Sequence, residues 1–338
     1  MEARLEVTRS QILGFRRAVG SLDERLPRGR RSLRRASWAG LQDSMPRAAL
    51  LSIHARVHGT GPTAWEDPSL VQLWGPRYSV YVVPERDRAL FSLGRLPEGG
   101  TARRRAEGVA ARLTETFGGT AITDREAGDA LGVHHNMLRY AAPTGTVLIR
   151  WEGARAPTVW TVPAPDVAPH DARIELARRY LHVFGPTTAG AFRQWAGLRG
   201  KGGNVAFDAL QDELIPVRTP AGDRWALASD EDALRADPQP AAAARFLPSG
   251  DAYFLLQGDD RELLVPDAAH RDELWTSRVW PGALLVGGDI VGTWRRKQGT
   301  VSIQTWRGLT RAERDAVEAE AATLPLPDVD RIVVRWDG

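Results

Sequence analysis

Apolar residues recur at helical spacing, and short strand-like runs follow them, in three successive parts of the chain. The pattern is clearest between residues 174 and 227. Residues 174–184 form one apolar helix face, Phe192 and Trp195 belong to the next helix, and 207–214 predict a third. A hairpin over 215–227 follows. This order predicts a helix-turn-helix unit with a wing.

A second copy of the pattern spans about 102–163. Thr123 and Glu126 predict a capping box at the start of one helix. Residues 134–141 predict a further helix that would serve as the recognition element. Strands at 146–151 and 159–162 predict the wing.

The first copy, within residues 5–91, is less regular. Helices are predicted at 12–19, 33–41 and 46–57, and a strand at 78–83. The irregularity lies in the break before Pro46, because proline ends or kinks a helix.

From about residue 245 the pattern changes to strands. Gly287-Gly288-Asp289 is typical of a hairpin turn, and Thr310 with Glu313 predicts the start of a helix that runs to about 323. We therefore predict an α+β fold, with tandem winged helix-turn-helix domains followed by a small antiparallel, barrel-like C-terminal domain. The expected domains are 1–100, 101–168, 169–236 and 245–338.

Composition narrows the class of protein. The 338 residues are 43% hydrophobic and 26% charged, as in ordinary globular proteins. The absence of cysteine excludes disulfides, thiolate metal sites and cysteine nucleophiles. We predict no metal and no cofactor, since the adjacent His134 and His135 cannot point from one helix face toward one ion. No apolar run approaches membrane-spanning length, so we expect a cytoplasmic monomer that does not bind membranes.

Positive charge is concentrated near the amino end. Residues 1–60 hold twelve Arg against five acids, whereas 205–275 hold six Arg against fifteen acids. Such a cluster favours a surface that faces phosphate, although a solvated helix end gives the same composition. We predict double-stranded DNA, possibly damaged, as the partner. The predicted DNA-binding residues are Arg28, Arg30, Arg31, Arg34, Arg35, Arg139, Arg199 and Lys201.

Gln42, Asp43 and Ser44 follow the basic run and precede Pro46. A break between two helices can direct a polar side chain outward, toward a nucleotide. A lone glutamine near a helix end is more often a capping or exposed residue.

The sequence also resembles a known protein family. The blocks LQDSMPRAALLSIHARV, WGPRYSVYVVPERD, LFSLGRLP, RYLHVFGPTTAGAFRQWAGL and ALLVGGDIVGTWRR resemble successive blocks of the bacterial winged-helix family that includes crosslink-repair DNA glycosylases. The resemblance extends in order from about residue 8 to residue 307. It implies winged helices around a DNA channel, and excision of N7-alkylated or crosslinked purines.

The resemblance also implies a catalytic motif of Gln, an apolar residue, and Gln or Asp. Here Gln42 matches, Asp43 replaces the apolar residue and Ser44 replaces the second amide or carboxylate. In the family these side chains hold the attacking water and steady an oxocarbenium-like sugar. We therefore take Gln42, Ser44 and Asp43 as candidate catalytic residues.

Three functions remain open. The chain is a monofunctional DNA glycosylase, or it is a catalytically inactive damage sensor or transcription regulator on the same scaffold. A third possibility is that the same units bind a protein, since fold alone does not fix function. Affinity for DNA that falls steeply with added salt would separate the first two from the third.

Overall fold

The computed structural model describes residues 5–153, 155–200, 202–277, 279–327, 329 and 331–337. Their fold is α+β, with three small three-stranded sheets and one five-stranded sheet. Each three-stranded sheet is built largely from one of the three repeated segments of the sequence, and the five-stranded sheet comes from the last hundred residues.

The first segment contains the sheet β2-β4-β3. Its elements are α2 (Arg30–Ala36), β2 (Leu41–Gln42), α3 (Ala48–Arg56), η1 (Ala64–Glu66), β3 (Leu70–Trp74), η2 (Pro76–Tyr78), β4 (Val80–Pro84), η3 (Glu85–Asp87) and α4 (Arg88–Leu93). The break before Pro46 is present, but α2 ends at Ala36 rather than near residue 41. The released residues form β2, which pairs with β4.

The second segment contains the sheet β5-β7-β6, and its core also includes Trp74 of the first segment. Its elements are α5 (Gly100–Phe117), β5 (Ile122–Thr123), α6 (Asp124–Ala130), η4 (His135–Thr144), β6 (Val147–Arg150) and β7 (Thr158–Thr161). The capping box of Thr123 and Glu126 is confirmed. The predicted helix at 134–141 is a 3₁₀ helix, η4, which contains Pro143; proline lacks the N–H that a regular helix needs.

The third segment follows the predicted order of three helices and a hairpin. Its elements are α7 (Pro169–Phe184), α8 (Ala189–Ala196), α9 (Gly202–Ala209), η5 (Gln211–Glu213), β8 (Leu214–Thr219), β9 (Gly222–Leu227), η6 (Ala228–Asp230) and α10 (Glu231–Arg235). The amino-terminal β1 (Leu5–Glu6) pairs in parallel with β8, and Ile12 and Phe15 of α1 (Arg9–Val19) share a core with Val217. The division into four domains stays a prediction, but residues 5–19 lie against the third segment.

The last sheet has the order β10-β11-β12-β13-β14. Its region contains β10 (Ala244–Leu247), η7 (Ala252–Phe254), α11 (Asp260–Leu264), α12 (Ala268–Leu274), β11 (Gly282–Val286), β12 (Asp289–Lys297), β13 (Thr300–Thr305), α13 (Arg311–Ala322) and β14 (Val333–Asp337). The turn at 287–289 and the capping box at Thr310 are confirmed. The sheet is not purely antiparallel as predicted: α13 crosses between β13 and β14, and these two strands are therefore parallel. Within the described residues β10 and β14 are its two edges.

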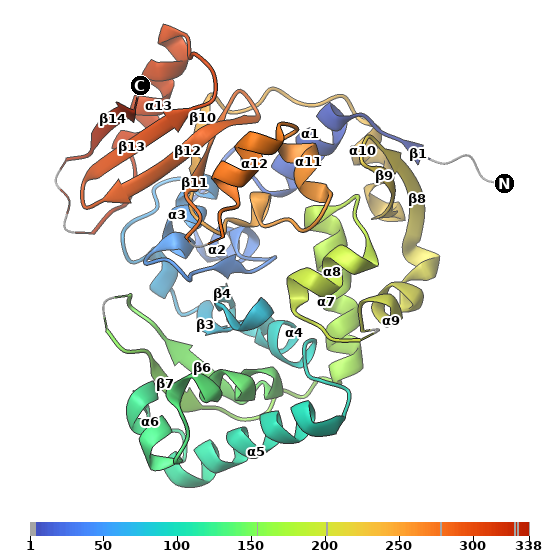
Figure 1. The fold of residues 1–338 in the computed structure, drawn as a ribbon, viewed down its shortest axis with the longest axis vertical. Helices are drawn as coiled ribbons and strands as arrows, with labels where there is room; N and C mark the ends of the chain where they lie inside the picture. Colours follow the sequence, from blue (N-terminus) through green and yellow to red (C-terminus); the bar gives the residue numbers. More distant parts are fainter. Residues whose placement is uncertain are drawn as a thin grey trace.

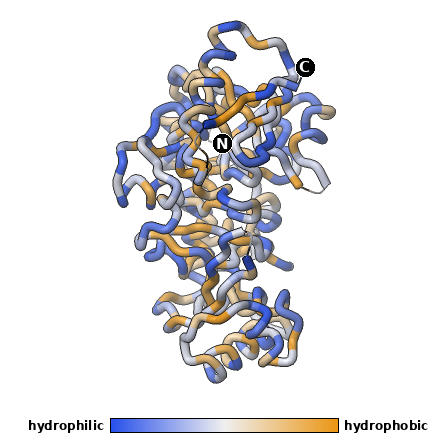
Figure 2. Tube along the Cα trace, turned by 90° about the vertical axis from the view of Figure 1, so that its left-hand side faces the viewer, coloured by the Kyte–Doolittle hydropathy of each residue, from blue (hydrophilic) through white to orange (hydrophobic). Residues whose placement is uncertain are grey.

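The molecule is elongated. The C-terminal sheet with α13 forms one end in Figure 1, and the second segment forms the other end, below α4 and α7. In the perpendicular view of Figure 2 the second segment is again a separate lobe at the lower end. In the described part of the chain, no helix is both long and apolar enough to cross a membrane.

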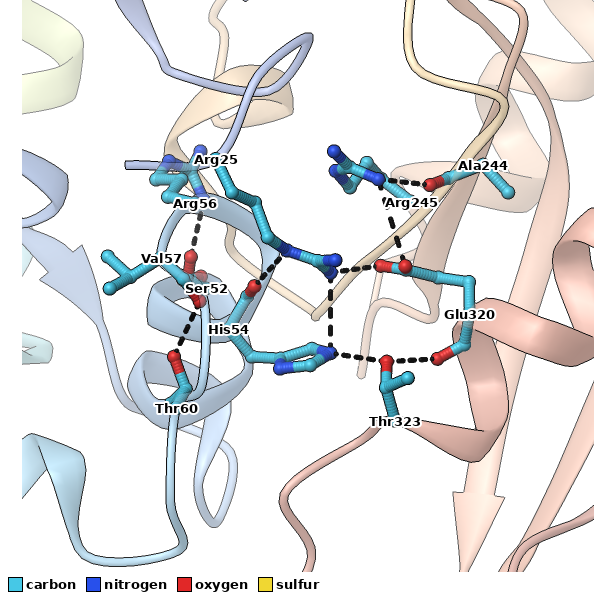
Figure 3. Close-up of polar contacts among 10 residues, drawn as sticks. All are labelled: Arg25, Ser52, His54, Arg56, Val57, Thr60, Ala244, Arg245, Glu320 and Thr323. Atoms are coloured by element: carbon cyan, nitrogen blue, oxygen red, sulfur yellow. Dashed lines mark hydrogen bonds and ion pairs between the residues drawn. The ribbon is translucent and has the colours of Figure 1, made fainter. Parts of the chain in front are cut away.

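Helix α3 is fixed to the C-terminal sheet by a buried polar network (Figure 3). Arg25 donates to the carbonyl oxygen of His54 at 2.7 Å and pairs with Glu320 of α13. His54 Nε2 contacts Thr323 Oγ1 at 3.1 Å, and Arg245 lies 3.7 Å from Glu320. Burial, and the nearby charges of Arg25 and Arg245, lower the pKa of His54 to about 3. The imidazole therefore stays neutral. The bonds of this network attach the first segment firmly to the last sheet and to α13.

Candidate active site

The predicted motif lies at a corner where strand β2 turns into helix α3. Leu41 is buried and pairs with Val82, and Gln42 pairs with Tyr81. The backbone N–H of Asp43 donates to the carbonyl of Val80 at 2.7 Å, after which the chain bends and α3 begins at Ala48. Because side chains alternate along extended backbone, Gln42 and Asp43 face opposite sides.

Asp43 faces inward. Its side chain is 1% exposed, and both oxygens accept hydrogen bonds: Oδ1 from the Ala49 backbone N–H at 2.9 Å and Oδ2 from Gln72 Nε2 at 2.8 Å. Gln72 Oε1 in turn accepts from the backbone N–H of Trp151, in the second segment. Burial raises the pKa of Asp43 to about 7, against the opposing effect of these hydrogen bonds and of Arg47. The carboxyl group fixes the start of α3 and, unlike the Gln42 side chain, it does not face the surface.

Gln42 is half-buried and Ser44 is exposed. The Gln42 amide nitrogen donates to Ser44 Oγ at 3.2 Å, and Arg77 Nη2 donates to the amide oxygen at 3.3 Å. On its other side Gln42 contacts Gly250, where an added Cβ would lie 3.1 Å from Gln42 Cδ. The structure therefore brings together Gln42 and Ser44, and orients the amide so that its oxygen points toward a guanidinium.

The turn that carries Arg77 is strained. Arg77 and Tyr78 are consecutive residues with φ of 54° and 58°, in the left-handed region that non-glycine residues rarely adopt. Each such residue costs about 1–3 kcal/mol, and strain of this kind gathers at functional sites. The strained turn directs Arg77 toward Gln42.

A cavity of about 320 Å³ opens beside the motif. Met45 and Pro46 line one side, and Trp280, Trp294 and Arg296 of the last region line the other. Aromatic and apolar walls with a cation at the edge suit a flat, partly polar ring. None of the described residues form a group of histidine and acidic side chains that would hold a metal ion.

The five predicted arginines of the basic run lie on and before α2. Arg28, Arg30, Arg31 and Arg35 are exposed, and Arg34 is half-buried. Among the described residues, one weak ion pair involves this group: Arg30, whose side chain is 71% exposed, lies 3.6 Å from Asp67. The run therefore presents free positive charge on the segment that leads into β2.

The other predicted cations lie elsewhere. Arg139, in η4, has its guanidinium 5.7 Å from the ring centre of Tyr140. Arg199 is exposed in the loop between α8 and α9. Lys201 lies outside the described residues.

Comparison with known proteins places the chain in a family. A model described as DNA glycosylase AlkZ-like matches residues 35–325. The chain belongs to the AlkZ-like DNA glycosylase family. Among solved structures it is similar to the DNA glycosylase AlkZ of Streptomyces sahachiroi, with a TM-score of 0.80 and 18% identity over 98% of this chain and 100% of that one. At that identity the likeness concerns the fold. None of the curated proteins matches the sequence.

Membership of the AlkZ-like family supports a DNA-repair role of the glycosylase kind. Sequence reasoning missed three residues that shape the site: Arg77, Gln72 and Gly250. Arg77 lies in Gly-Pro-Arg-Tyr between two strands, which is a turn signal. That signal marks a turn but not the side chain that the turn directs. Gln72 and Gly250 carry no local signal, because their role depends on contacts far away in the chain.

Proposed function

We propose that this protein is a monofunctional DNA glycosylase that hydrolyses the N-glycosidic bond of alkylated or crosslinked purines. The observation that carries the proposal is the outward-facing pair of Gln42 and Ser44, with the glutamine amide held by Arg77. The cavity beside Met45 would receive the displaced base, since an enzyme that acts on a duplex base must first extrude it.

Release of an alkylated purine requires little chemical activation by the protein. An N7-alkylated purine is cationic, so the electrons of the C1′–N9 bond move onto the base and neutralise it as it leaves. Water then bonds to C1′ and releases its proton to solvent. The Gln42 amide oxygen and Ser44 Oγ each have a lone pair that can accept from this water. Their contribution is to orient it against the sugar.

No Schiff-base step is proposed. The sequence contains only two lysines, Lys201 and Lys297, and neither is near the motif along the sequence. A lyase step needs an amine at C1′. The expected product is therefore an intact strand with an abasic site.

We infer that the three small sheets with their helices act as winged helices that hold double-stranded DNA. The order of helices before a hairpin supports this for each segment. The exposed arginines of α2 precede the motif and would contact backbone phosphate, because a guanidinium grips phosphate through two hydrogen bonds.

One observation favours a second function. Ser44 stands where the family pattern has an amide or a carboxylate, and it can neither remove a proton nor supply negative charge. On that basis the alternative is a DNA-binding damage sensor or regulator that lacks excision.

The two functions separate in one assay. The protein is incubated with a duplex that contains one N7-alkylguanine, and alkaline cleavage then reveals abasic sites. We expect cleavage at the lesion with wild-type protein. Gln42→Ala should slow excision by about 10²–10³-fold, the usual effect of removing one transition-state hydrogen bond. DNA affinity should persist, since one neutral side chain is lost.

Gln298→Ala is the matched control, because Gln298 is exposed in the turn between β12 and β13. Its excision rate should equal that of the wild type. Tight DNA binding without any abasic product would establish the sensor or regulator instead.

A further inference from the structure

A second cavity, of about 350 Å³, lies where the three repeated segments meet. Tyr78 contributes from the first segment, Arg105 of α5 and Tyr140 of η4 from the second, and Arg199 from the third. Arg95, just after α4, completes the wall. The function proposed above assigns no role to these residues, and only Arg199 is among the DNA contacts predicted from the sequence.

Arg95 is a buried cation that forms no ion pair with a carboxylate in the part of the chain that the structure describes. Its side chain is 5% exposed; Nε donates to the carbonyl of Ala196 at 3.1 Å, and Nη1 donates to those of Trp74 and Phe91 at 2.9 and 3.3 Å. Its Nη2 forms no hydrogen bond with any residue that the structure describes. Burial lowers the pKa of Arg95 to about 10, so the group remains charged at neutral pH. A buried charge is costly unless it is paired.

The cavity contains further positive charge that is not neutralised. Glu98 is the one carboxylate among its described lining residues, and it pairs with Arg173, with Nη1 and Oε1 2.5 Å apart. Arg95, Arg105 and Arg199 form no ion pair among the described residues. Three guanidinium groups thus border one space without an acid to balance them.

Aromatic rings hold two of these guanidinium groups. The Tyr78 and Tyr140 rings meet edge to face at 4.9 Å. Arg95 lies 5.1 Å from the Tyr78 ring centre, and Arg105 lies 5.5 Å from that of Tyr140. Such cation–π contacts orient a guanidinium and reduce the entropy that it loses on binding an anion.

We propose that this cavity, which we call the Arg95 pocket, binds a phosphate group. Several guanidinium forks directed at one space match the tetrahedral oxygens of phosphate better than a single planar carboxylate. A space of this size also has room for the sugar that carries the phosphate.

The strained turn connects the Arg95 pocket to the motif. Arg77 points to Gln42, while its neighbour Tyr78 lines the pocket. The close approach of Gly197 to the Arg77 backbone, where an added Cβ would lie 3.0 Å from the nitrogen, fixes the turn against the third segment. The source of the phosphate rests on the proposed function: it belongs to a DNA strand, near the nucleotide at Gln42. A free phosphate would satisfy the same groups.

The test compares the full-length wild type with Arg105→Gln/Arg199→Gln and with a matched control, Arg104→Gln. Arg105 and Arg199 are exposed, so their replacement should leave the fold intact, and Arg104 is exposed on the same helix without lining the pocket. Thermal unfolding of all three proteins checks the fold.

The first arm measures affinity for an undamaged duplex against salt. Each lost phosphate contact makes the negative slope of log K against log[salt] shallower by about 0.9, so the slope should become shallower by about 1 in the double variant and stay unchanged in the control. Single methylphosphonate substitutions along one strand then locate the contact. Wild-type affinity should fall at one position at which the double variant is insensitive.

The second arm titrates inorganic phosphate and follows its ³¹P line width. Broadening by the wild type and the control, but not by the double variant, with an unchanged DNA slope, would assign the pocket to free phosphate. Equal slopes, equal methylphosphonate profiles and equal line widths in all three proteins would overturn the proposal. Neither arm scores base release, so the result stands whether or not the protein excises bases.

Discussion

The two ends of helix α3 are held in opposite ways. Just before its start, Gln42 is half-buried and Ser44 is exposed. The hydrogen bond from Arg77 to Gln42 is 3.3 Å long. Near its end, Arg56 forms two bonds of 2.7 Å with Asp251, and both side chains are buried. The rigid end therefore positions the helix, while the open end leaves polar groups free for a substrate.

The loop that carries Asp251 links the two ends. Its neighbour Gly250 contacts Gln42, and Ser52 of α3 donates to Asp251 at 2.6 Å. Together with the network of Figure 3, this ties α3 to the C-terminal region at several points. Substitutions at the rigid end should therefore lower stability, and substitutions at the open end should lower activity.

The largest effect is expected for Asp251→Ala. It leaves the Arg56 guanidinium buried without its carboxylate partner, which costs about 3–5 kcal/mol of unfolding free energy. Urea unfolding followed by circular dichroism measures the loss. Glu231→Ala breaks an exposed pair with Arg235 and should cost less than about 1 kcal/mol. Equal losses in the two variants would contradict the contrast between the ends of α3.

The next prediction concerns pH and Asp43. Its folded pKa, about 7, lies above the ordinary value of 3.8 for an aspartic acid, so the folded state favours the protonated acid. The stabilisation is complete below the unfolded pKa and is lost as pH rises through the folded one. Relative to Asp43→Asn, the wild type should lose up to about 4 kcal/mol between about pH 4 and pH 8.

Urea unfolding of both proteins at a series of pH values measures this difference. His54 is present in both, so its own titration cancels. A difference that does not change with pH would mean that Asp43 is ionised throughout, and that the inward-facing carboxyl is better solvated than its contacts indicate.

Much of the fold follows from local pattern. The capping boxes at Thr123 and Thr310 and the turn at Gly287 were predictable because a few neighbouring residues determine each of them. The placement of α1 and the parallel pairing of β14 were not predictable. The spacing of Ile12 and Phe15 predicts an apolar helix face, but the neighbouring sequence does not indicate that Val217 packs against this face.

The same limit applies to the site. The outward direction of Gln42 and the inward direction of Asp43 agree with simple alternation along a strand. Arg77 and Arg95 were missed because their roles arise where distant segments meet: Arg77 contacts Gln42, and Arg95 donates to Ala196 in the third segment. Local sequence thus indicates the motif but not the cations that surround it.

A smaller effect is expected for Arg77. Arg77→Gln removes the charged donor to Gln42, and a hydrogen bond to a charged group contributes about 1.5–3 kcal/mol, so excision should slow by roughly 10–100-fold. Single-turnover rates at saturating enzyme measure the change without the effect on affinity. Arg86→Gln is the control, because Arg86 is 62% exposed and only weakly paired with Asp87.

Arg77→Gly adds a second readout at this position. Glycine adopts a positive φ without the penalty of a side chain, so this variant should unfold at a higher urea concentration while excising more slowly. A variant that is less stable and equally active would show that Arg77 has a structural role alone.

The smallest effect tests the open end directly. Ser44→Asp introduces beside Gln42 the carboxylate that the family resemblance implies, where it can accept from the attacking water and stabilise positive charge on the sugar. We expect single-turnover excision to rise about ten-fold, equivalent to about 1.4 kcal/mol. Ser10→Asp adds the same charge at an exposed position on α1 and should leave the rate unchanged. A slower Ser44→Asp protein would mean that the serine oxygen itself orients the water and that a charge displaces it. The open end would then be adapted to serine.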